Sequence, residues 1–127
     1  MTNQTNPTKI LIIEDDPFIS SMYATKFEHE GYTVATAADG ELGLSMIKTE
    51  KPDLILLDIL LPKMNGFEIL KNSKQDPEIK DIPVILLTNL NQKNEIEQGL
   101  AMGASDYLIK AHFTPAEVIK KIQEIIK

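Results

Sequence analysis

Acidic, hydroxyl and ammonium side chains follow the apolar runs of this sequence in a regular way. Glu14 and Asp15 come directly after the first run, and Asp58 follows the second. Thr88 follows the third run, and Lys110 follows the fourth. In a parallel sheet the carboxyl ends of all strands lie at one edge, so these side chains are expected to meet there. Together they could bind a metal ion and a phosphoryl group.

The acidic residues of this set require a cation. If Asp15 and Asp58 approach within about 5 Å, each pair of unit charges costs roughly 3 kcal/mol at an effective dielectric near 20, and Glu14 adds to the repulsion. Carboxylate oxygens, a backbone carbonyl and water are ligands for a hard divalent ion, so we expect Mg²⁺, with Mn²⁺ as a substitute. Asp16 is instead predicted to be the N-cap of the next helix.

The same set is suited to phosphoryl transfer. A carboxylate would attack a phosphoryl donor as the nucleophile, while the metal and Lys110 stabilise the charge on the transferred group and Thr88 donates a hydrogen bond to it. Taken singly, the residues have plainer interpretations: Asp58 is a loop residue or cap, Thr88 a turn hydroxyl and Lys110 a solvated side chain. Their joint placement after strands favours the chemical interpretation.

Apolar periodicity predicts five strands that alternate with five helices. The strands are predicted at 10–13, 33–36, 54–57, 84–87 and 107–109. The helices are predicted from Asp16-Pro17 to Gly31, over 39–49, 66–74 and 92–102, and onward from an N-cap at Thr114. Nearly continuous apolar runs are typical of strands that helices cover on both faces. The sequence therefore predicts an α/β fold, with a doubly wound parallel sheet and right-handed crossovers.

The composition is that of one globular domain. The chain has 127 residues, 43% of them hydrophobic, and its net charge of -6 gives no basic surface for nucleic acid. It has no cysteine, which excludes thiol catalysis and thiolate metal sites. No apolar run approaches the roughly 18 residues that span a bilayer, and the first residues carry no secretion signal. We therefore expect a cytoplasmic protein without direct nucleic-acid binding or membrane insertion, with a flexible tail at 1–8 and one domain at 9–127.

Five segments together resemble a known family. Their order and spacing are those of the receiver domain of bacterial two-component response regulators, and the resemblance covers the chain from Lys9 onward. The matching segments are ILIIEDD at 10–16, PDLILLD at 52–58, PKMNG at 62–66, PVILLT at 83–88 and GASDYLIK at 103–110. The resemblance implies a flavodoxin-like (βα)5 fold with strand order 2-1-3-4-5.

The resemblance also assigns roles at the acidic site. It implies that Asp58 is the phosphoacceptor and that Asp15 binds Mg²⁺ directly. Glu14 matches an acidic position that reaches the ion through water. Leu60, two residues after the acceptor, would provide its backbone carbonyl to the metal.

Further matches concern signalling. Thr88 and Lys110 match the hydroxyl and lysine that act on the phosphoryl group, and Tyr107 matches an aromatic switch residue that turns inward after Thr88 moves. The sequence departs from the family where Ala111 replaces the usual proline after the lysine, so the peptide bond after Lys110 is expected to be trans or strained. Asn89 is larger than the residue usual after the threonine and could narrow phosphoryl access.

The predicted function is that of a stand-alone receiver that is not itself an enzyme but assists its own phosphorylation and dephosphorylation. A sensor histidine kinase or a histidine phosphotransfer protein would provide the phosphoryl group. Phosphorylation would then change a surface that contacts a downstream protein, in two-component signalling or a phosphorelay. The sequence names neither the kinase nor that target, and it leaves open whether activation produces a homodimer.

Three alternatives use the same residues differently. An aspartyl phosphatase needs a second aspartate two positions after the nucleophile, and Leu60 occupies that position. A flavodoxin-like cofactor binder needs a phosphate-binding loop after Ile13, where acidic residues would repel the phosphate. A degenerate receiver would act as a docking module independent of phosphorylation; the complete set of acidic, threonine and lysine residues argues against it, whereas Ala111 and Asn89 keep it open.

Overall fold

The computed structural model describes residues 8–89, 93–110 and 114–126. Its ten elements alternate between strand and helix, as the sequence predicts. They are β1 (Lys9–Ile13), α1 (Pro17–His29), β2 (Thr33–Ala37), α2 (Gly40–Glu50), β3 (Leu54–Asp58), α3 (Gly66–Gln75), β4 (Val84–Thr88), α4 (Lys93–Ala101), β5 (Asp106–Ile109) and α5 (Pro115–Ile126). The five strands are all parallel and lie in the order β2-β1-β3-β4-β5. The predicted fold class and strand order are therefore confirmed.

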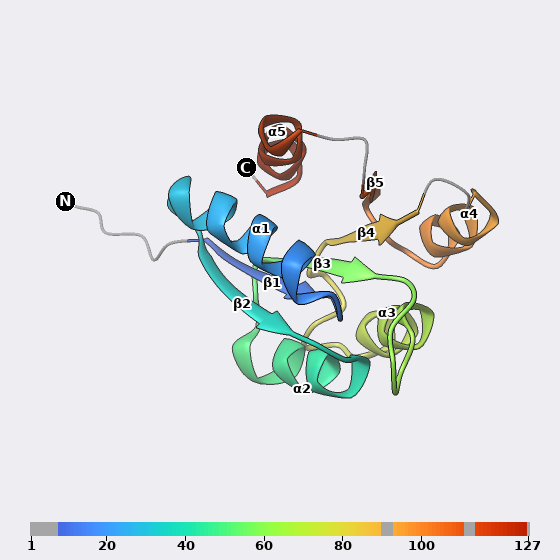
Figure 1. Ribbon diagram of the computed structural model, residues 1–127. Helices are drawn as coiled ribbons and strands as arrows, with labels where there is room; N and C mark the ends of the chain where they lie inside the picture. The colour runs from blue at the N-terminus through green and yellow to red at the C-terminus, as the bar shows by residue number, and fades with distance from the viewer. Residues whose placement is uncertain (1–7, 90–92, 111–113, 127) are drawn as a thin grey trace.

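Helices cover both faces of the sheet. α1 and α5 lie on one face, and α2 and α3 lie on the other (Figure 1). Alternate residues of the central strands enter two separate apolar clusters: Leu54 and Leu56 face α1 and α5, whereas Ile55 and Leu57 face α2 and α3. Burial on both faces explains why these strands are nearly continuous apolar runs in the sequence.

Polar residues fix the ends of the helices close to where the sequence places them. Asp16 caps α1 by accepting a hydrogen bond from Phe18 N at 2.9 Å. After α1 the chain turns at Gly31, whose φ of 95° favours glycine. Thr114 caps α5, because its Oγ1 accepts from Glu117 N at 3.2 Å while Thr114 N donates to the Glu117 carboxylate at 2.8 Å. The predicted caps at Asp16 and Thr114 are confirmed.

Two sequence predictions fall largely outside the described residues. Of the predicted tail at 1–8, the structure describes only Thr8, whose carbonyl accepts a hydrogen bond from Thr33 N at 2.9 Å. Ala111, the predicted departure after Lys110, also lies outside the described residues. Among the helices of the described ranges, none has the length and apolar character needed to cross a bilayer.

Candidate functional site

The strand register brings the predicted site residues to one edge of the sheet. Ile13 pairs with Leu57 between β1 and β3, so Glu14 and Asp58, the residues that follow them, lie at equivalent levels. Thr88 pairs with Ile109 between β4 and β5, and Lys110 N donates to Thr88 O at 2.9 Å. Because the strands are parallel, the polar residues that follow four apolar runs gather at one edge.

Alternation along the strands then separates these side chains by face. Asp58 follows Leu54 and Leu56 at intervals of two and therefore belongs to the α1 and α5 side of the sheet. Glu14 likewise comes two residues after Ile12 of β1, and Lys110 comes two residues after Leu108 of β5, both of which face α1 and α5. Thr88 instead follows Leu86, which faces α2 and α3. The two carboxylates and the ammonium group are thus placed together, whereas the Thr88 side chain belongs to the other face.

Three carboxylates form a compact cluster at this edge. Glu14, Asp15 and Asp58 each place an oxygen within 4.8 Å of the other two. Glu14 and Asp58 are buried, with 2% and 4% exposed surface, whereas Asp15 is exposed. At this separation the repulsion between two ionised groups is several kcal/mol at an effective dielectric of about 20. The expected approach of Asp15 to Asp58 is confirmed.

Lys110 provides a cation to the two buried carboxylates. Its Nζ donates a hydrogen bond to Asp58 Oδ2 at 3.0 Å and forms an ion pair with Glu14 Oε1 at 2.8 Å. Burial lowers the pKa of Lys110, but its contacts with Glu14 and Asp58 outweigh this, so the net pKa is raised. Burial raises the pKa of Glu14 to about 7, against the opposing effect of Lys110. The position of Lys110 makes it part of the site despite the unusual residue that follows it.

Backbone groups of the β3–α3 connection complete the surroundings of Asp58. Leu60 N donates to Asp58 Oδ1 at 3.2 Å, so both carboxylate oxygens of Asp58 have a donor. The side chain of Leu60 is 59% exposed and lies outside the core. Leu60 is therefore held beside Asp58 by its backbone, which is the part of the residue that the sequence resemblance assigns to the metal.

The Thr88 hydroxyl is buried without a partner. Thr88 has no exposed surface, and its Oγ1 makes no hydrogen bond within the part of the chain that the structure describes. Such a group costs about 1 to 3 kcal/mol, and most buried polar atoms in native proteins avoid it. An unused donor at the carboxyl end of β4, the edge of the sheet that carries the acidic cluster, is consistent with a ligand oxygen that arrives only in another state of the protein.

This hydroxyl gives a stability prediction. Thr88→Val keeps the shape of the side chain and removes the buried donor, so we expect it to stabilise the metal-free protein by about 1 kcal/mol, to be measured by urea denaturation. Thr88→Ser is the matched control, because it keeps the hydroxyl and loses a buried methyl group, and it should destabilise the protein. A loss of stability in Thr88→Val would show that the hydroxyl has a partner in solution.

Tyr107 lies near this edge without joining the cluster. It pairs with Leu86 in the β4–β5 register, and its half-buried ring packs against the apolar cluster on the α2 and α3 side. Lys121 Nζ of α5 lies 5.7 Å from the ring centroid. Tyr107 therefore shares a sheet face with Thr88 and also contacts α5, and its role as a switch stays a prediction.

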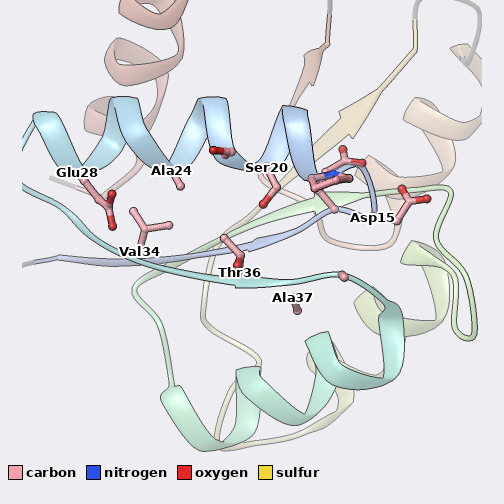
Figure 2. Close-up of a pocket in the computed structure, with 11 residues that line it drawn as sticks. Asp15, Ser20, Ala24, Glu28, Val34, Thr36 and Ala37 are labelled. Carbon is pink, nitrogen blue, oxygen red and sulfur yellow. The ribbon is translucent and has the colours of Figure 1, made fainter.

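A groove next to the acidic cluster was not predicted from the sequence. It lies between α1 and β2, has a volume of about 420 Å³, and begins at Glu14 and Asp15. Ser20 of α1 lies opposite Thr36 of β2 in its wall, and Glu28 lies farther along α1 (Figure 2). No motif marks these residues, since the groove depends on the distance between a helix and the edge strand β2. It leaves the exposed side of the acidic cluster accessible to solvent and small ions.

The donor set fits a hard divalent cation. Three carboxylates within 4.8 Å, one of them exposed, supply oxygen ligands and an open side where water and a phosphate oxygen could complete the coordination. Imidazole and thiolate ligands are absent from the set, which favours Mg²⁺ or Mn²⁺ over zinc. The sequence resemblance assigns Asp15 and Asp58 to the ion directly, Glu14 through water, and Leu60 through its backbone carbonyl, and these roles stay predictions.

Fold and site define a doubly wound α/β protein with an acidic, lysine-containing site at the carboxyl edge of its sheet. The family model for the response regulator receiver domain matches residues 10–123. This chain belongs to that family, whose members are the phosphoacceptor domains of two-component systems.

Individual relatives agree with this assignment. The chain is 40% identical over 119 residues to the DNA-binding dual master transcriptional regulator RpaA of Synechocystis, covering 94% of this chain and 49% of that protein. The chain spans about half the length of the curated relatives it matches. Among solved structures, chemotaxis response regulator CheY4 of Vibrio cholerae is 30% identical with a TM-score of 0.86, covering 94% of this chain and 99% of that chain. The BeF3-activated N-terminal receiver domain of Klebsiella pneumoniae RstA is 31% identical with a TM-score of 0.87, covering 94% and 99%.

Proposed function

We propose that Asp58 accepts a phosphoryl group from a phosphohistidine donor in a Mg²⁺-dependent reaction. The observation that carries the proposal is the placement of the Asp58 carboxylate in the acidic cluster with Glu14 and Asp15, where Lys110 Nζ donates to Asp58 at 3.0 Å and also contacts Glu14 at 2.8 Å. The Asp58 carboxylate accepts a hydrogen bond at each oxygen, from Lys110 Nζ and from Leu60 N, and lies beside the exposed Asp15 carboxylate. It is therefore oriented for attack without being neutralised by a single fixed partner.

The residues of the site have separate tasks in the proposed reaction. A carboxylate oxygen of Asp58 attacks phosphorus and forms an acyl phosphate, while the phosphorus–nitrogen bond breaks and its electron pair returns to the imidazole of the donor. Lys110 stabilises negative charge on the transferred group, and the Thr88 hydroxyl donates to one of its oxygens. When bound, Mg²⁺ would neutralise the carboxylates and the phosphoryl oxygens. Asp15, Asp58, Glu14 and Leu60 are the proposed residues around the ion.

The signal would leave the site through Thr88. Once its hydroxyl gains a phosphoryl oxygen as a partner, the state with Thr88 drawn toward Asp58 becomes favoured, and this provides space for Tyr107. Because the Tyr107 ring packs beside Lys121, its movement would alter the surface formed by β5 and α5. We infer that a histidine kinase or phosphotransfer protein is the upstream partner and that another protein recognises the altered surface.

The proposal is tested by measuring covalent phosphate. Purified protein incubated with acetyl phosphate and Mg²⁺ should gain the mass of one phosphate, and chelation of the metal should prevent the gain. Borohydride reduction followed by peptide mapping should locate the modification at Asp58. Absence of any modification, with acetyl phosphate and with histidine kinases alike, would favour a docking module independent of phosphorylation. Turnover of many phosphate esters per protein would favour a phosphatase.

Magnesium should also stabilise the protein in the absence of a phosphoryl donor. A ligand that binds only the folded state at one hundred times its Kd adds about 2.7 kcal/mol to the free energy of unfolding. We expect thermal denaturation to show a rising Tm with increasing Mg²⁺, and the rise to be much smaller in Asp15→Asn. A rise equal to that caused by NaCl at the same ionic strength would contradict a specific metal site.

A further inference from the structure

The connection between β3 and α3, which contains Leu60, packs directly against Gly40 of α2. Gly40, the first residue of α2, is buried, and its N–H donates to Pro62 O at 3.2 Å. A Cβ at Gly40 would overlap Met64 O and lie 2.6 Å from the Met64 carbonyl carbon. The backbone of α2 and the backbone of residues 59–65 are thus in direct contact, with no side chain of Gly40 between them.

The β3–α3 connection behaves as one tied unit. Met64 N donates to Pro62 O at 2.8 Å, and Gly66 N donates to Ile59 O at 2.8 Å. At its other end, a Cβ at Gly66 would lie 2.6 Å from Asp58 O, so this end is pressed against the backbone of the acceptor residue. We therefore expect a displacement at Met64 to move the whole connection, including Leu60.

A charged contact supports the same junction. Lys63 has a φ of 69°, which is unfavourable for a residue with a side chain, and its Nζ lies 3.7 Å from Asp39 Oδ2. Asp39 is the N-cap of α2 and accepts a hydrogen bond from Leu42 N at 2.9 Å. The N-cap of α2 therefore also forms an ion pair with the residue of positive φ in the β3–α3 connection.

We propose that Gly40 is a positioning residue for metal binding, because its missing side chain lets the β3–α3 connection approach closely enough for the Leu60 carbonyl to reach the ion. This rests on the proposed function, which places the ion beside Asp15 and Asp58. Gly40 does not have a positive φ, so alanine is compatible with its backbone conformation. The effect of Gly40→Ala is therefore a displacement of the connection rather than a rearrangement of α2.

The first experiment compares two buried helical glycines. Gly40→Ala should weaken Mg²⁺ binding by about tenfold or more, measured by isothermal titration calorimetry without a phosphoryl donor. Gly99→Ala is the matched control. Gly99 lies in α4, and its added Cβ would meet the end of the Leu86 side chain rather than the β3–α3 connection. It should lower Tm and leave Mg²⁺ affinity unchanged. At saturating Mg²⁺, phosphate uptake by Gly40→Ala should recover, since affinity rather than the chemical step is affected.

A second pair of variants decides the matter if Gly40→Ala does not fold. Lys63→Gly and Lys51→Gly each relieve a positive φ, of 69° and 44°, and each remove an exposed ion pair. Lys51 ends α2 at its carboxyl end, whereas Lys63 lies in the connection itself. Lys63→Gly loosens the connection and should reduce Mg²⁺ affinity, and Lys51→Gly should not.

The outcomes separate the inference from the proposed function. If the unaltered protein binds Mg²⁺ and both Gly40→Ala and Lys63→Gly bind it equally well, the positioning role is wrong and the proposed function stands. If Gly40→Ala is unfolded, equal affinities in Lys63→Gly and Lys51→Gly overturn the positioning role. If the unaltered protein does not bind Mg²⁺, the proposed function and the positioning role both fail.

Discussion

Asp58→Asn is expected to abolish phosphate uptake from acetyl phosphate at every Mg²⁺ concentration. Asparagine keeps an oxygen that Lys110 can donate to, so the site retains its shape, but the amide is not a nucleophile for phosphorus. The rate should fall by at least about 1,000-fold, the scale seen when a nucleophile is removed from a preorganised site. Intact-mass spectrometry over a time course measures the effect.

Two aspartates of the chain serve as controls. Asp53→Asn changes a residue at the opposite end of β3, where Asp53 accepts a hydrogen bond from Lys9 N at 2.8 Å, and it should label like the unaltered protein. Asp15→Asn should label slowly at low Mg²⁺ and recover as Mg²⁺ is raised, because it removes a ligand and keeps the acceptor. Equal labelling of Asp58→Asn and the unaltered protein would show that another residue accepts the phosphoryl group.

Sequence patterns were sufficient for the strands, the helices and the fold class because burial dictates them directly, whereas the strand order came from the family resemblance. Strands covered on both faces must be apolar at consecutive positions, as in Ile10–Ile13, and helices need a cap, as at Asp16. Element boundaries shifted by a residue or so; α2, predicted at 39–49, runs from Gly40 to Glu50 with Asp39 as its cap. Hydrophobic periodicity and helix capping are local properties, so they can be recognised in the sequence without knowledge of the tertiary structure.

The composition of the site was also predictable, since parallel strands must end at one edge. The clustering of Glu14, Asp15 and Asp58 follows from this rule together with strand order. The position of the Lys110 ammonium between Glu14 and Asp58 depends also on side-chain alternation along the strands. This alternation places all three side chains on the α1 and α5 side of the sheet. Roles within the cluster came from the family resemblance rather than from the spacing.

Contacts between elements that are distant in the sequence could not be predicted in this way. The approach of Gly40 to Met64, and the groove between α1 and β2, depend on sheet twist and on the distance between layers. Neither the sheet twist nor the distance between layers produces a periodic pattern in the sequence. The dipeptide Asp39-Gly40 indicates only a helix start, although a glycine directly after an N-cap is a signal for close backbone approach that could have been weighed.

Lys110→Met is expected to destabilise the protein without Mg²⁺ by about 3 kcal/mol, because it leaves Glu14 and Asp58 buried without the cation that contacts both. Methionine preserves the length and apolar stem of the side chain, so the loss is mainly electrostatic. Urea denaturation at neutral pH measures it. Phosphate uptake should also slow by about 100-fold, since a charge that stabilises the transferred group is missing.

Lys9→Met is the matched control for this prediction. Lys9 also contacts a carboxylate, Glu50 Oε1 at 2.9 Å, but the two side chains are 33% and 41% exposed. An exposed pair contributes less than about 1 kcal/mol, so Lys9→Met should have a small effect. Equal losses in the two variants would mean that Lys110 is a solvated side chain rather than part of the site.

The loss of stability in Lys110→Met, called the deficit below, should depend on pH if its origin is electrostatic. Because the folded-state pKa of Lys110 is raised, its contribution is complete below the ordinary value of 10.5 and is lost as the pH rises through the folded-state pKa. The pKa of Glu14 is raised to about 7, so this partner is fully ionised only above that pH. The deficit should therefore be largest between about pH 7 and 10.5 and smaller at pH 5.

Addition of Mg²⁺ should reduce the deficit, because the ion replaces the missing positive charge among the same carboxylates. A deficit that neither pH nor Mg²⁺ changes would assign the loss to packing.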